Sequence, residues 1–271
     1  MSILIITGSG GLVGSESVKF FSKKFTKIIG IDNDMRSYFF GKSASVKSNI
    51  YNLKRDFKNY VHYSFDIANY KKVKNIFKKY NNKISFIIHS AAQPSHDWAA
   101  KEPLVDFSTN AIGTLNILEN MRLNCPNAKL IHFSTNKVYG DRPNTLPLQE
   151  KNQRYEIKNK NKFYRNGIDE SMSVDDCKHS LFGASKLSAD IYCQEYIKYF
   201  NLKIGIFRGG CLTGPLHQGT ELHGFLNYLV KAAKEKKIYK IFGYKGKQVR
   251  DNLHSEDVVS AIWEFYKTRD N

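Results

Sequence analysis

The sequence predicts an α/β fold in which a doubly wound, parallel β-sheet carries helices on both faces. Short apolar runs at residues 3–7, 27–31 and 84–89 are rich in isoleucine and too short to form helices. Segments with helical periodicity follow these runs, and such strand–helix alternation is typical of a parallel sheet. A glycine-rich turn after the first run indicates that the first strand leads directly into a helix.

The expected elements can be placed in chain order. Apolar residues are continuous, and strands are therefore expected, at residues 3–7, 27–31, 60–65, 84–89, 130–134 and 203–207. Apolar residues recur on one face, and helices are therefore expected, at residues 15–24, 70–80, 104–123, 182–199, 221–236 and 256–266. We also expect a polar loop from about 33 to 59, an irregular segment at 141–178 and a further strand at 239–243.

The charge and hydropathy patterns exclude several classes of protein. Lys and Arg number 42 against 25 Asp and Glu, which gives a net charge of +17. Only nine of the 42 are arginines, and the lysines are spread along the chain. We therefore expect a solvated surface that attracts an anionic small molecule, and no nucleic-acid partner. No run of 18 apolar residues occurs, so no membrane-spanning helix is expected.

The cysteines and the first residues bear on location. Four cysteines are scattered without a Cys-x-x-Cys pair, so we expect no metal site. A reducing, cytoplasmic location is the corresponding expectation. The first residues lack the basic segment of a secretory signal, so no signal peptide is expected.

The turn after the first strand has the pattern of a dinucleotide-binding site. Gly8, Gly11 and Gly14 give the spacing Gly-x-x-Gly-x-x-Gly between a strand and a helix. Glycines allow a tight turn and a close approach of the pyrophosphate, which the helix N-terminus then binds. Asp32 follows the second strand, where a carboxylate accepts a hydrogen bond from a ribose hydroxyl, so NAD is favoured. Arg36 lies close by and leaves NADP open as the alternative.

Further short motifs follow in order along the chain. They are Phe65-Asp66-Ile67, His89-Ser90-Ala91-Ala92-Gln93, Asn110-Ala111-Ile112-Gly113-Thr114 and Ser134-Thr135-Asn136-Lys137-Val138-Tyr139-Gly140. With the glycine turn, this set resembles the extended short-chain dehydrogenase/reductase superfamily, and within it the NAD-dependent nucleotide-sugar epimerase/dehydratase family. The resemblance implies a Rossmann-like NAD-binding domain at residues 1–209 and a small, interleaved substrate-binding region at residues 210–271.

The resemblance also implies which residues bind NAD. They follow the carboxyl ends of the expected strands, apart from one in each of two helices. These residues are Gly8, Gly11, Leu12, Val13, Gly14, Asp32, Asn33, Asp66, Ile67, Ala91, Ala92, Gln93, Asn110, Ser134 and Lys186.

At the catalytic centre the sequence departs from the family pattern. Family members pair a Thr or Ser with Tyr-x-x-x-Lys, in which the Tyr phenolate takes a hydroxyl proton and the Lys lowers its pKa. Thr135 and Lys186 match this pattern, but Phe182 stands at the Tyr position and has no proton to exchange. Three interpretations remain open: a substitute base, a variant reaction, or binding of NAD and a nucleotide sugar without turnover.

Several residues are candidates for the substitute base. Lys137 is favoured because it lies two residues after Thr135 at the end of a strand, where sites form in sheets of this kind. Desolvation beside another cation would lower the pKa of this lysine. The other candidates are Thr135, Glu170, Cys177 and His179.

The segment Thr135-Asn136-Lys137 distinguishes subclasses of the family. Sugar 4,6-dehydratases have Thr-Asp-Glu there, and this chain has neither acid. The segments at 134–141, 167–171 and 246–254 resemble the CDP-paratose 2-epimerase branch. That resemblance implies an enzyme that oxidises a sugar carbon of a nucleotide-diphosphate sugar to a ketone and reduces it again. The residues implied in substrate binding are Gln93, Asn136, Arg208, Arg250 and His254.

Alternatives to this function stay open. One is a catalytically inactive protein that binds NAD or a nucleotide sugar, and another is a related sugar dehydratase. For Arg208 and Arg250, a structural ion pair is the alternative to diphosphate binding. The resemblance further implies a homodimer. Because the chain ends soon after Asp257-Val258-Val259, we expect a short substrate-binding region.

Overall fold

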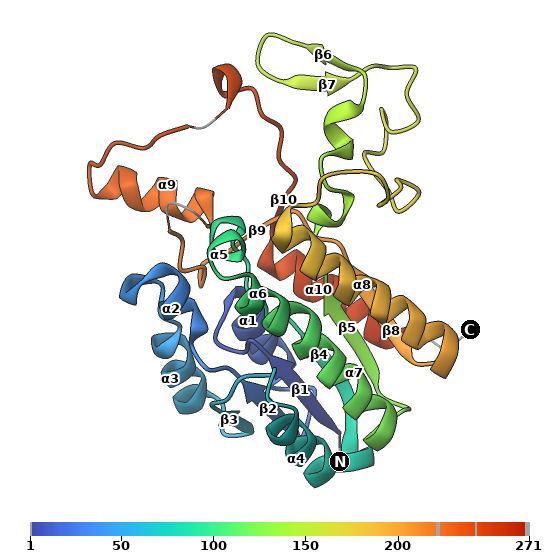
Figure 1. Ribbon diagram of the computed structural model, residues 1–271. Helices are drawn as coiled ribbons and strands as arrows, with labels where there is room; N and C mark the ends of the chain where they lie inside the picture. Colours follow the sequence, from blue (N-terminus) through green and yellow to red (C-terminus); the bar gives the residue numbers. More distant parts are fainter. Residues whose placement is uncertain (1, 221–222, 242, 269–271) are drawn as a thin grey trace.

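The computed structural model describes residues 2–220, 223–241 and 243–268, and it confirms the predicted α/β class (Figure 1). Six parallel strands form one sheet in the order β3-β2-β1-β4-β5-β8. These strands are β1 (Ile3–Thr7), β2 (Lys27–Ile31), β3 (Tyr60–Tyr63), β4 (Ile84–His89), β5 (Lys129–Phe133) and β8 (Lys203–Phe207).

Helices cover both faces of the sheet (Figure 1). The α-helices of the described residues are α1 (Leu12–Phe21), α2 (Met35–Phe40), α3 (Lys47–Asp56), α4 (Tyr70–Tyr80), α5 (His96–Lys101), α6 (Pro103–Phe107), α7 (Gly113–Asn124), α8 (Ser180–Phe200), α9 (Phe225–Lys234) and α10 (Ser255–Lys267). Ile3 and Ile5 of β1 pack in one core cluster with residues of α4, α7 and α8. Leu4 and Ile6 pack in another cluster with residues of α1, α3 and α10. Because successive side chains of a strand point to opposite faces, the sheet is buried on both sides.

The winding of the chain reverses between β1 and β4, which are neighbours in the middle of the sheet. β1 pairs with β2 on one side and with β4 on the other, and Thr7 lies opposite His89 at the carboxyl ends. The early strands extend the sheet toward β3, whereas the later strands extend it toward β8. In sheets of this kind, ligands bind outside the carboxyl ends of the strands at such a reversal.

Most of the expected strands and helices are confirmed, with shifts of a few residues at their ends. The polar loop expected at 33–59 is wrong, because this segment contains α2 and α3. Helix α3 buries only Asn49, Ile50 and Leu53. A face with two apolar residues is too narrow to be identified from periodicity, so packing on the sheet decides the structure there.

The helix expected at 104–123 is divided into α6 and α7 by a π-helical turn, Ser108–Ile112. Such turns insert a residue into a helix and often lie at functional sites. The turn carries Asn110, whose side chain donates to Gln93 O at 3.1 Å and to Ser185 Oγ at 3.0 Å. The turn thereby connects α8 to the loop that follows β4.

The segment at 141–178 is mostly irregular, as expected, but it contains a hairpin of β6 (Leu148–Glu150) and β7 (Tyr155–Ile157). Figure 1 shows this hairpin well away from the central sheet. The Lys247 ammonium donates to Glu150 Oε1, and the amide of Tyr155 donates to Lys247 O at 3.4 Å. These contacts connect the hairpin to the C-terminal region.

The C-terminal region differs from expectation in three places. β9 (Cys211–Thr213) and β10 (Asn252–His254) pair in parallel, which the sequence did not indicate. The helix expected at 221–236 is α9, and its expected first residues, 221 and 222, lie outside the described residues. The described residues 239–241 and 243 form no strand, and residue 242 of that expected strand lies outside the described part.

Three further findings concern the described part of the chain. It has no helix that is both long and apolar enough to cross a membrane. It also has no group of three or more His, Cys, Asp or Glu side chains placed to hold a metal ion. The four cysteines are free thiols.

A buried ion pair fixes α8 to the end of β8. The Asp190 side chain is fully buried, and Arg208 donates to both of its carboxylate oxygens at 2.9 and 3.0 Å. Ser134 Oγ donates to the same carboxylate at 2.6 Å. Burial alone would raise the pKa of Asp190, but the hydrogen bonds from Arg208 and Ser134 outweigh it and hold the pKa below the usual 3.8. Arg208 also donates to the Tyr139 hydroxyl at 3.1 Å.

Replacing Arg208 should therefore destabilise the fold. We expect Arg208→Met to lower the free energy of unfolding by about 3–5 kcal/mol, because it leaves a buried carboxylate without its partner. Urea denaturation at neutral pH measures this loss. The difference from wild type should narrow as the pH falls below 3.8, since a carboxylate with a depressed pKa stabilises the fold only while it is ionised.

The matched control is Arg154→Met, which removes an exposed pair between Arg154 and Glu156 at 3.9 Å. It should change the free energy of unfolding by less than about 1 kcal/mol. Equal effects of the two substitutions would show that the buried pair does not stabilise the fold.

Candidate active site

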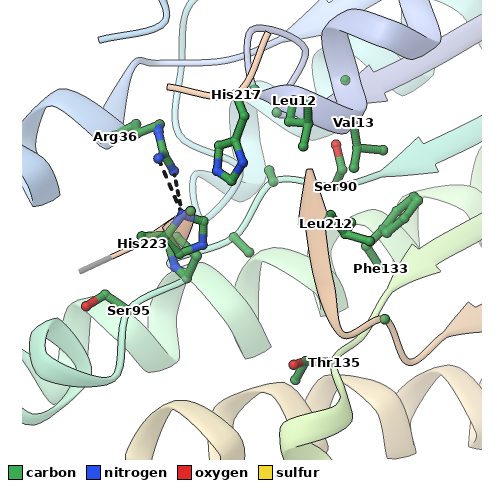
Figure 2. Close-up of a pocket in the computed structure, with 18 of the residues that line it drawn as sticks. Leu12, Val13, Arg36, Ser90, Ser95, Phe133, Thr135, Leu212, His217 and His223 are labelled. Atoms are coloured by element: carbon green, nitrogen blue, oxygen red, sulfur yellow. Dashed lines mark hydrogen bonds between the residues drawn. The ribbon is translucent and has the colours of Figure 1, made fainter. Parts of the chain in front are cut away.

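A cavity of about 700 Å³ opens outside the carboxyl ends of the strands, where the winding reverses (Figure 2). The glycine turn after β1 and the residues that follow β2, β3 and β4 line one part of it. Residues 133–137, Phe182, Lys186 and the segment at 209–218 line another part. The position agrees with the general rule for doubly wound sheets.

The glycine turn is shaped by close backbone approaches. Gly8 has a φ of +69°, and its amide donates to Ile31 O at 2.8 Å. A Cβ on Gly14 would lie 2.1 Å from Gly8 O, so a larger residue there would displace the turn. In the part of the chain that the structure describes, no side chain caps α1 at Gly11. The first amides of this helix are therefore suited to bind a diphosphate.

Asp32 stands beside this turn. Its carboxylate accepts from Gly10 N at 2.9 Å and from Asp34 N at 2.8 Å. Burial raises the pKa of Asp32, while these two backbone donors lower it in part. A carboxylate has more than two acceptor positions, so Asp32 can also accept a hydroxyl of the adenosine ribose. Asn33 lines the cavity beside it.

The guanidinium of Arg36, near the expected place of the adenosine ribose, is already engaged by other residues. It donates to Gln218 O at 2.7 Å and contacts His223 Nδ1 at 3.4 Å (Figure 2). Burial lowers the pKa of Arg36 to about 10. A 2′-phosphate would have to compete with these contacts, which favours NAD over NADP.

The residues predicted to bind the cofactor fall into two groups. One group lines the cavity and consists of Gly8, Gly11, Leu12, Val13, Gly14, Asp32, Asn33, Asp66, Ile67, Ala91, Ala92, Ser134 and Lys186. Gln93 and Asn110 form the second group and are absent from the described residues that line it. Both are buried, and Gln93 N donates to Asn110 Oδ1 at 2.9 Å, so they support the loop after β4. The lining residues include the glycine turn and the carboxylate of Asp32, which suit the diphosphate and a ribose of a dinucleotide.

The predicted catalytic residues come together at one end of the cavity. Thr135, Lys137, Phe182 and Lys186 all line it. Thr135 follows β5, and its Oγ1 accepts from the amide of Lys137 at 3.3 Å. The Lys186 ammonium is buried and donates to Phe133 O at 2.6 Å. Burial lowers the pKa of Lys186 to about 8.

Phe182 places an apolar ring one helical turn before Lys186. The ring is buried, with 7% of the residue exposed. The spacing of four residues puts Phe182 and Lys186 on the same side of α8. The geometry of the Tyr-x-x-x-Lys pattern is therefore kept, but the phenol that would exchange a proton is replaced by a phenyl ring.

The structure separates the candidates for a substitute base. Thr135 and Lys137 line the cavity. Cys177 and His179 contact each other, with Sγ 3.4 Å from Nε2, and among the described residues neither lines the cavity. Glu170 is exposed and does not line it either, as far as the described residues show.

The predicted substrate-binding residues also divide. Asn136 and Arg250 line the cavity, and both are exposed. Among the described residues, those that line the cavity do not include Gln93, Arg208 or His254. Arg208 forms the buried pair with Asp190, which is the structural role left open for it. His254 lies at the start of α10, where its Nδ1 accepts from Glu256 N at 3.3 Å.

The sequence interpretation missed His96. This residue begins α5, directly after the cap residue Ser95, and lines the cavity. Its ring packs edge-on against Phe182 with centroids 5.0 Å apart. The signal was present, because Ser95-His96-Asp97 follows the fourth strand within a few residues, at the sheet edge where sites form.

Comparisons with known proteins identify the family of this chain. The NAD dependent epimerase/dehydratase family matches residues 4–271. The chain is 34% identical to a CDP-paratose 2-epimerase from Salmonella typhi over 265 residues, which cover 96% of this chain and 73% of that protein. It is 31% identical to a dTDP-D-glucose 4,6-dehydratase from Dictyostelium discoideum over 267 residues, which cover 96% of this chain and 54% of that protein.

Solved structures have the same fold. The chain superposes on a UDP-glucuronic acid 4-epimerase from Bacillus cereus, in complex with UDP-glucuronic acid and NAD, with a TM-score of 0.77 and 24% identity. The match covers 99% of this chain and 74% of that chain. The chain also superposes on a dTDP-glucose 4,6-dehydratase from Bacillus anthracis, in complex with NAD, with a TM-score of 0.72 and 24% identity. This match covers 98% of this chain and 72% of that chain. Both epimerases and dehydratases are thus similar to this chain, and the family resemblance seen in the motifs is confirmed.

Removing the buried charge of Lys186 should stabilise the protein. We expect Lys186→Met to raise the free energy of unfolding at pH 7 by about 2 kcal/mol, because folding takes this ammonium out of water. A lysine whose folded pKa is depressed gains stability as the pH rises from about 8 toward 10.5, so the advantage of the variant should shrink in that range. Urea denaturation at a series of pH values measures both effects.

An exposed lysine on α4 provides the control. Lys71→Met should leave the free energy of unfolding nearly unchanged at each pH. A Lys186→Met variant that is less stable than wild type at pH 7 would contradict the interpretation.

Replacing Asp32 should weaken NAD+ binding. We expect Asp32→Ala to raise the Kd by about 10- to 100-fold, the range for losing a hydrogen bond to a charged group. The preference for NAD+ over NADP+ should fall at the same time. Fluorescence titration with the two cofactors measures the change, and Asp56→Ala, an exposed carboxylate on α3, is the control. An unchanged Kd for NAD+ would remove Asp32 from the site.

Proposed function

The chain belongs to the NAD dependent epimerase/dehydratase family, and on that basis we propose that it is an NAD-dependent epimerase of a nucleotide-diphosphate sugar, similar to CDP-paratose 2-epimerase. The observation that carries this proposal is the meeting of Thr135 and Lys186 in one cavity with the glycine turn and Asp32. Residues 1–209 would bind NAD, and residues 210–271 would complete the substrate side of the cavity.

NAD, when bound, would accept a hydride from a sugar carbon and return it to the opposite face. The protein's own groups would hold the sugar and its charge. Thr135 Oγ1 accepts from the amide of Lys137 at 3.3 Å and donates to Asn136 Oδ1 at 3.5 Å, so a bound sugar oxygen would replace Asn136 as the acceptor of its proton. The buried ammonium of Lys186 stabilises negative charge that develops on that oxygen, because its environment has a low dielectric constant.

Two exposed basic residues suit the cavity to an anionic substrate. Lys137 and Arg250 both line it. A guanidinium binds a phosphate through two parallel hydrogen bonds, and an ammonium adds a point charge. The net charge of +17 favours the approach of such an anion.

The acidic residues favour an epimerase over a 4,6-dehydratase. Among the described residues that line the cavity, the acids are Asp32, Asp66 and Asp97. The segment Thr135-Asn136-Lys137 supplies none, whereas the dehydratase pattern has an acid and a base there. Elimination of water from the sugar would therefore lack both of its proton-transfer groups at that segment. A second candidate function, binding without turnover, is favoured by Phe182.

Incubation with NAD+ and a panel of CDP-, UDP- and dTDP-sugars tests the function. For an epimerase we expect one sugar to give a product of the same mass with inverted configuration at one carbon. If that carbon carries deuterium, the product should retain it, because the hydride leaves and returns within one site. Nuclear magnetic resonance and mass spectrometry measure configuration and label.

Two other results would replace the proposal. A product that has lost one water would identify a dehydratase. Saturable binding of NAD+ with no conversion of any sugar in the panel would identify a binding protein.

A further inference from the structure

The ring of His96 packs against Phe182, the residue that stands where the family pattern has a tyrosine. His96 lies on α5 and Phe182 on α8, and the two rings meet edge-on with centroids 5.0 Å apart. Both residues line the cavity, as do Thr135 and Lys186. A titratable ring therefore stands beside the position at which the family pattern has its proton-transfer group.

The contacts of His96 define how its ring can act. Nδ1 lies 3.0 Å from Ser180 Oγ. Ser180 Oγ also accepts from the amide of Gly183 at 3.2 Å. A hydroxyl oxygen has two lone pairs, so it can accept a second hydrogen bond, from a protonated Nδ1 of His96. In that tautomer Nε2 carries a lone pair, and among the described residues no hydrogen bond engages Nε2. The ring is then oriented by one nitrogen and basic at the other.

The backbone supports this orientation from both sides. Ser180 has a φ of +63°, a conformation that residues other than glycine rarely adopt. Ser95 caps α5 by accepting from the amide of Trp98 at 3.4 Å. The strained residue Ser180 and the capping residue Ser95 thus both help to fix the position of the His96 ring. Backbone strain of this kind is concentrated at functional sites.

The surroundings favour the neutral form of the imidazole. Burial lowers the pKa of His96 from 6.5, the positive charge of Lys137 lowers it further, and Asp97 raises it in part. Lys137 comes from the turn after β5 and Asp97 from α5 itself, while α8 contributes the uncharged Ser180 and Phe182. A neutral imidazole can accept a proton near pH 7, which the ammonium of Lys137, with donors only, cannot do.

We propose that His96 is the proton-transfer group of this site, taking the place of the phenol that Phe182 lacks. This rests on the proposed function. In the oxidation, the sugar hydroxyl loses its proton to Nε2 of His96, and its carbon loses a hydride with two electrons to NAD+, so that the C–O bond becomes C=O. In the reduction both transfers reverse, and His96 returns the proton to the oxygen.

One test reads the position of His96 without turnover. The His96 ring resonance, assigned with His96→Gln, should titrate below pH 6.5 in the free protein. Its pKa should be lower by at least about half a unit with saturating NAD+ than with NADH, because the nicotinamide of NAD+ carries a positive charge that NADH lacks. Equal pKa values with both bound cofactors would overturn the proposal, whereas a failure of NAD+ to bind would overturn the proposed function.

A second test uses the sugar that the panel identifies. We expect His96→Gln to lower kcat by about 10²- to 10⁴-fold, the usual contribution of general acid–base catalysis. The Kd of NAD+ should not change. The fall of kcat at acidic pH should also disappear, because it reports protonation of His96. The double variant His96→Gln with Phe182→Tyr should recover at least tenfold, since a phenol would then stand one turn before Lys186.

The control is His62→Gln, which changes a histidine on β3 that is absent from the described lining of the cavity. It should keep the wild-type kcat and pH profile. A His96→Gln variant that keeps its kcat within tenfold would overturn the proposal. So would one that loses kcat but keeps the acidic limb and gains nothing from Phe182→Tyr, since those results indicate a merely structural role.

Discussion

The site depends on the chain leaving two neighbouring parallel strands, β1 and β4, in opposite directions. Thr7 and His89 end these strands side by side, and the loops that follow them must diverge. They first approach very closely, since a Cβ on Gly8 would lie 2.8 Å from the amide nitrogen of Ala91. Glycine at position 8 therefore sets the width of the crevice at its base.

Helix α8 carries two buried charges one turn apart, and they have different surroundings. Asp190 is neutralised by Arg208 and anchors the helix to β8. Lys186 donates to a backbone oxygen, and the carboxylates of Asp190 and Asp106 offset its burial only in part. The paired charge fixes the helix, and the less compensated one adds a positively charged group to the lining of the cavity. Two groups four positions apart on one helix thus differ in effect: Asp190 stabilises the fold, whereas the burial of Lys186 lowers its stability.

The sequence sufficed where one local signal decides the structure. Continuous apolar runs predicted the six strands of the sheet, and the glycine spacing predicted the turn, because both are set by nearby residues. Helix α3 was missed because its apolar face is narrow and its packing is tertiary. Gln93 and Asn110 lie in motifs of the family, but only the fold shows that the side chain of Asn110 bonds the backbone of Gln93. His96 was missed because its ring packs against Phe182, which is 86 positions away in the chain.

The hairpin of β6 and β7 has a consequence for how this protein could diverge from its relatives. It contacts Lys247 through Glu150 and Tyr155, and Arg250 at the rim of the cavity is three residues further along. An insertion or deletion in the hairpin would shift Lys247 and the backbone that carries Arg250. A change in this peripheral hairpin can thus alter the lining of the cavity at Arg250, while the residues of the glycine turn and of α8 stay the same.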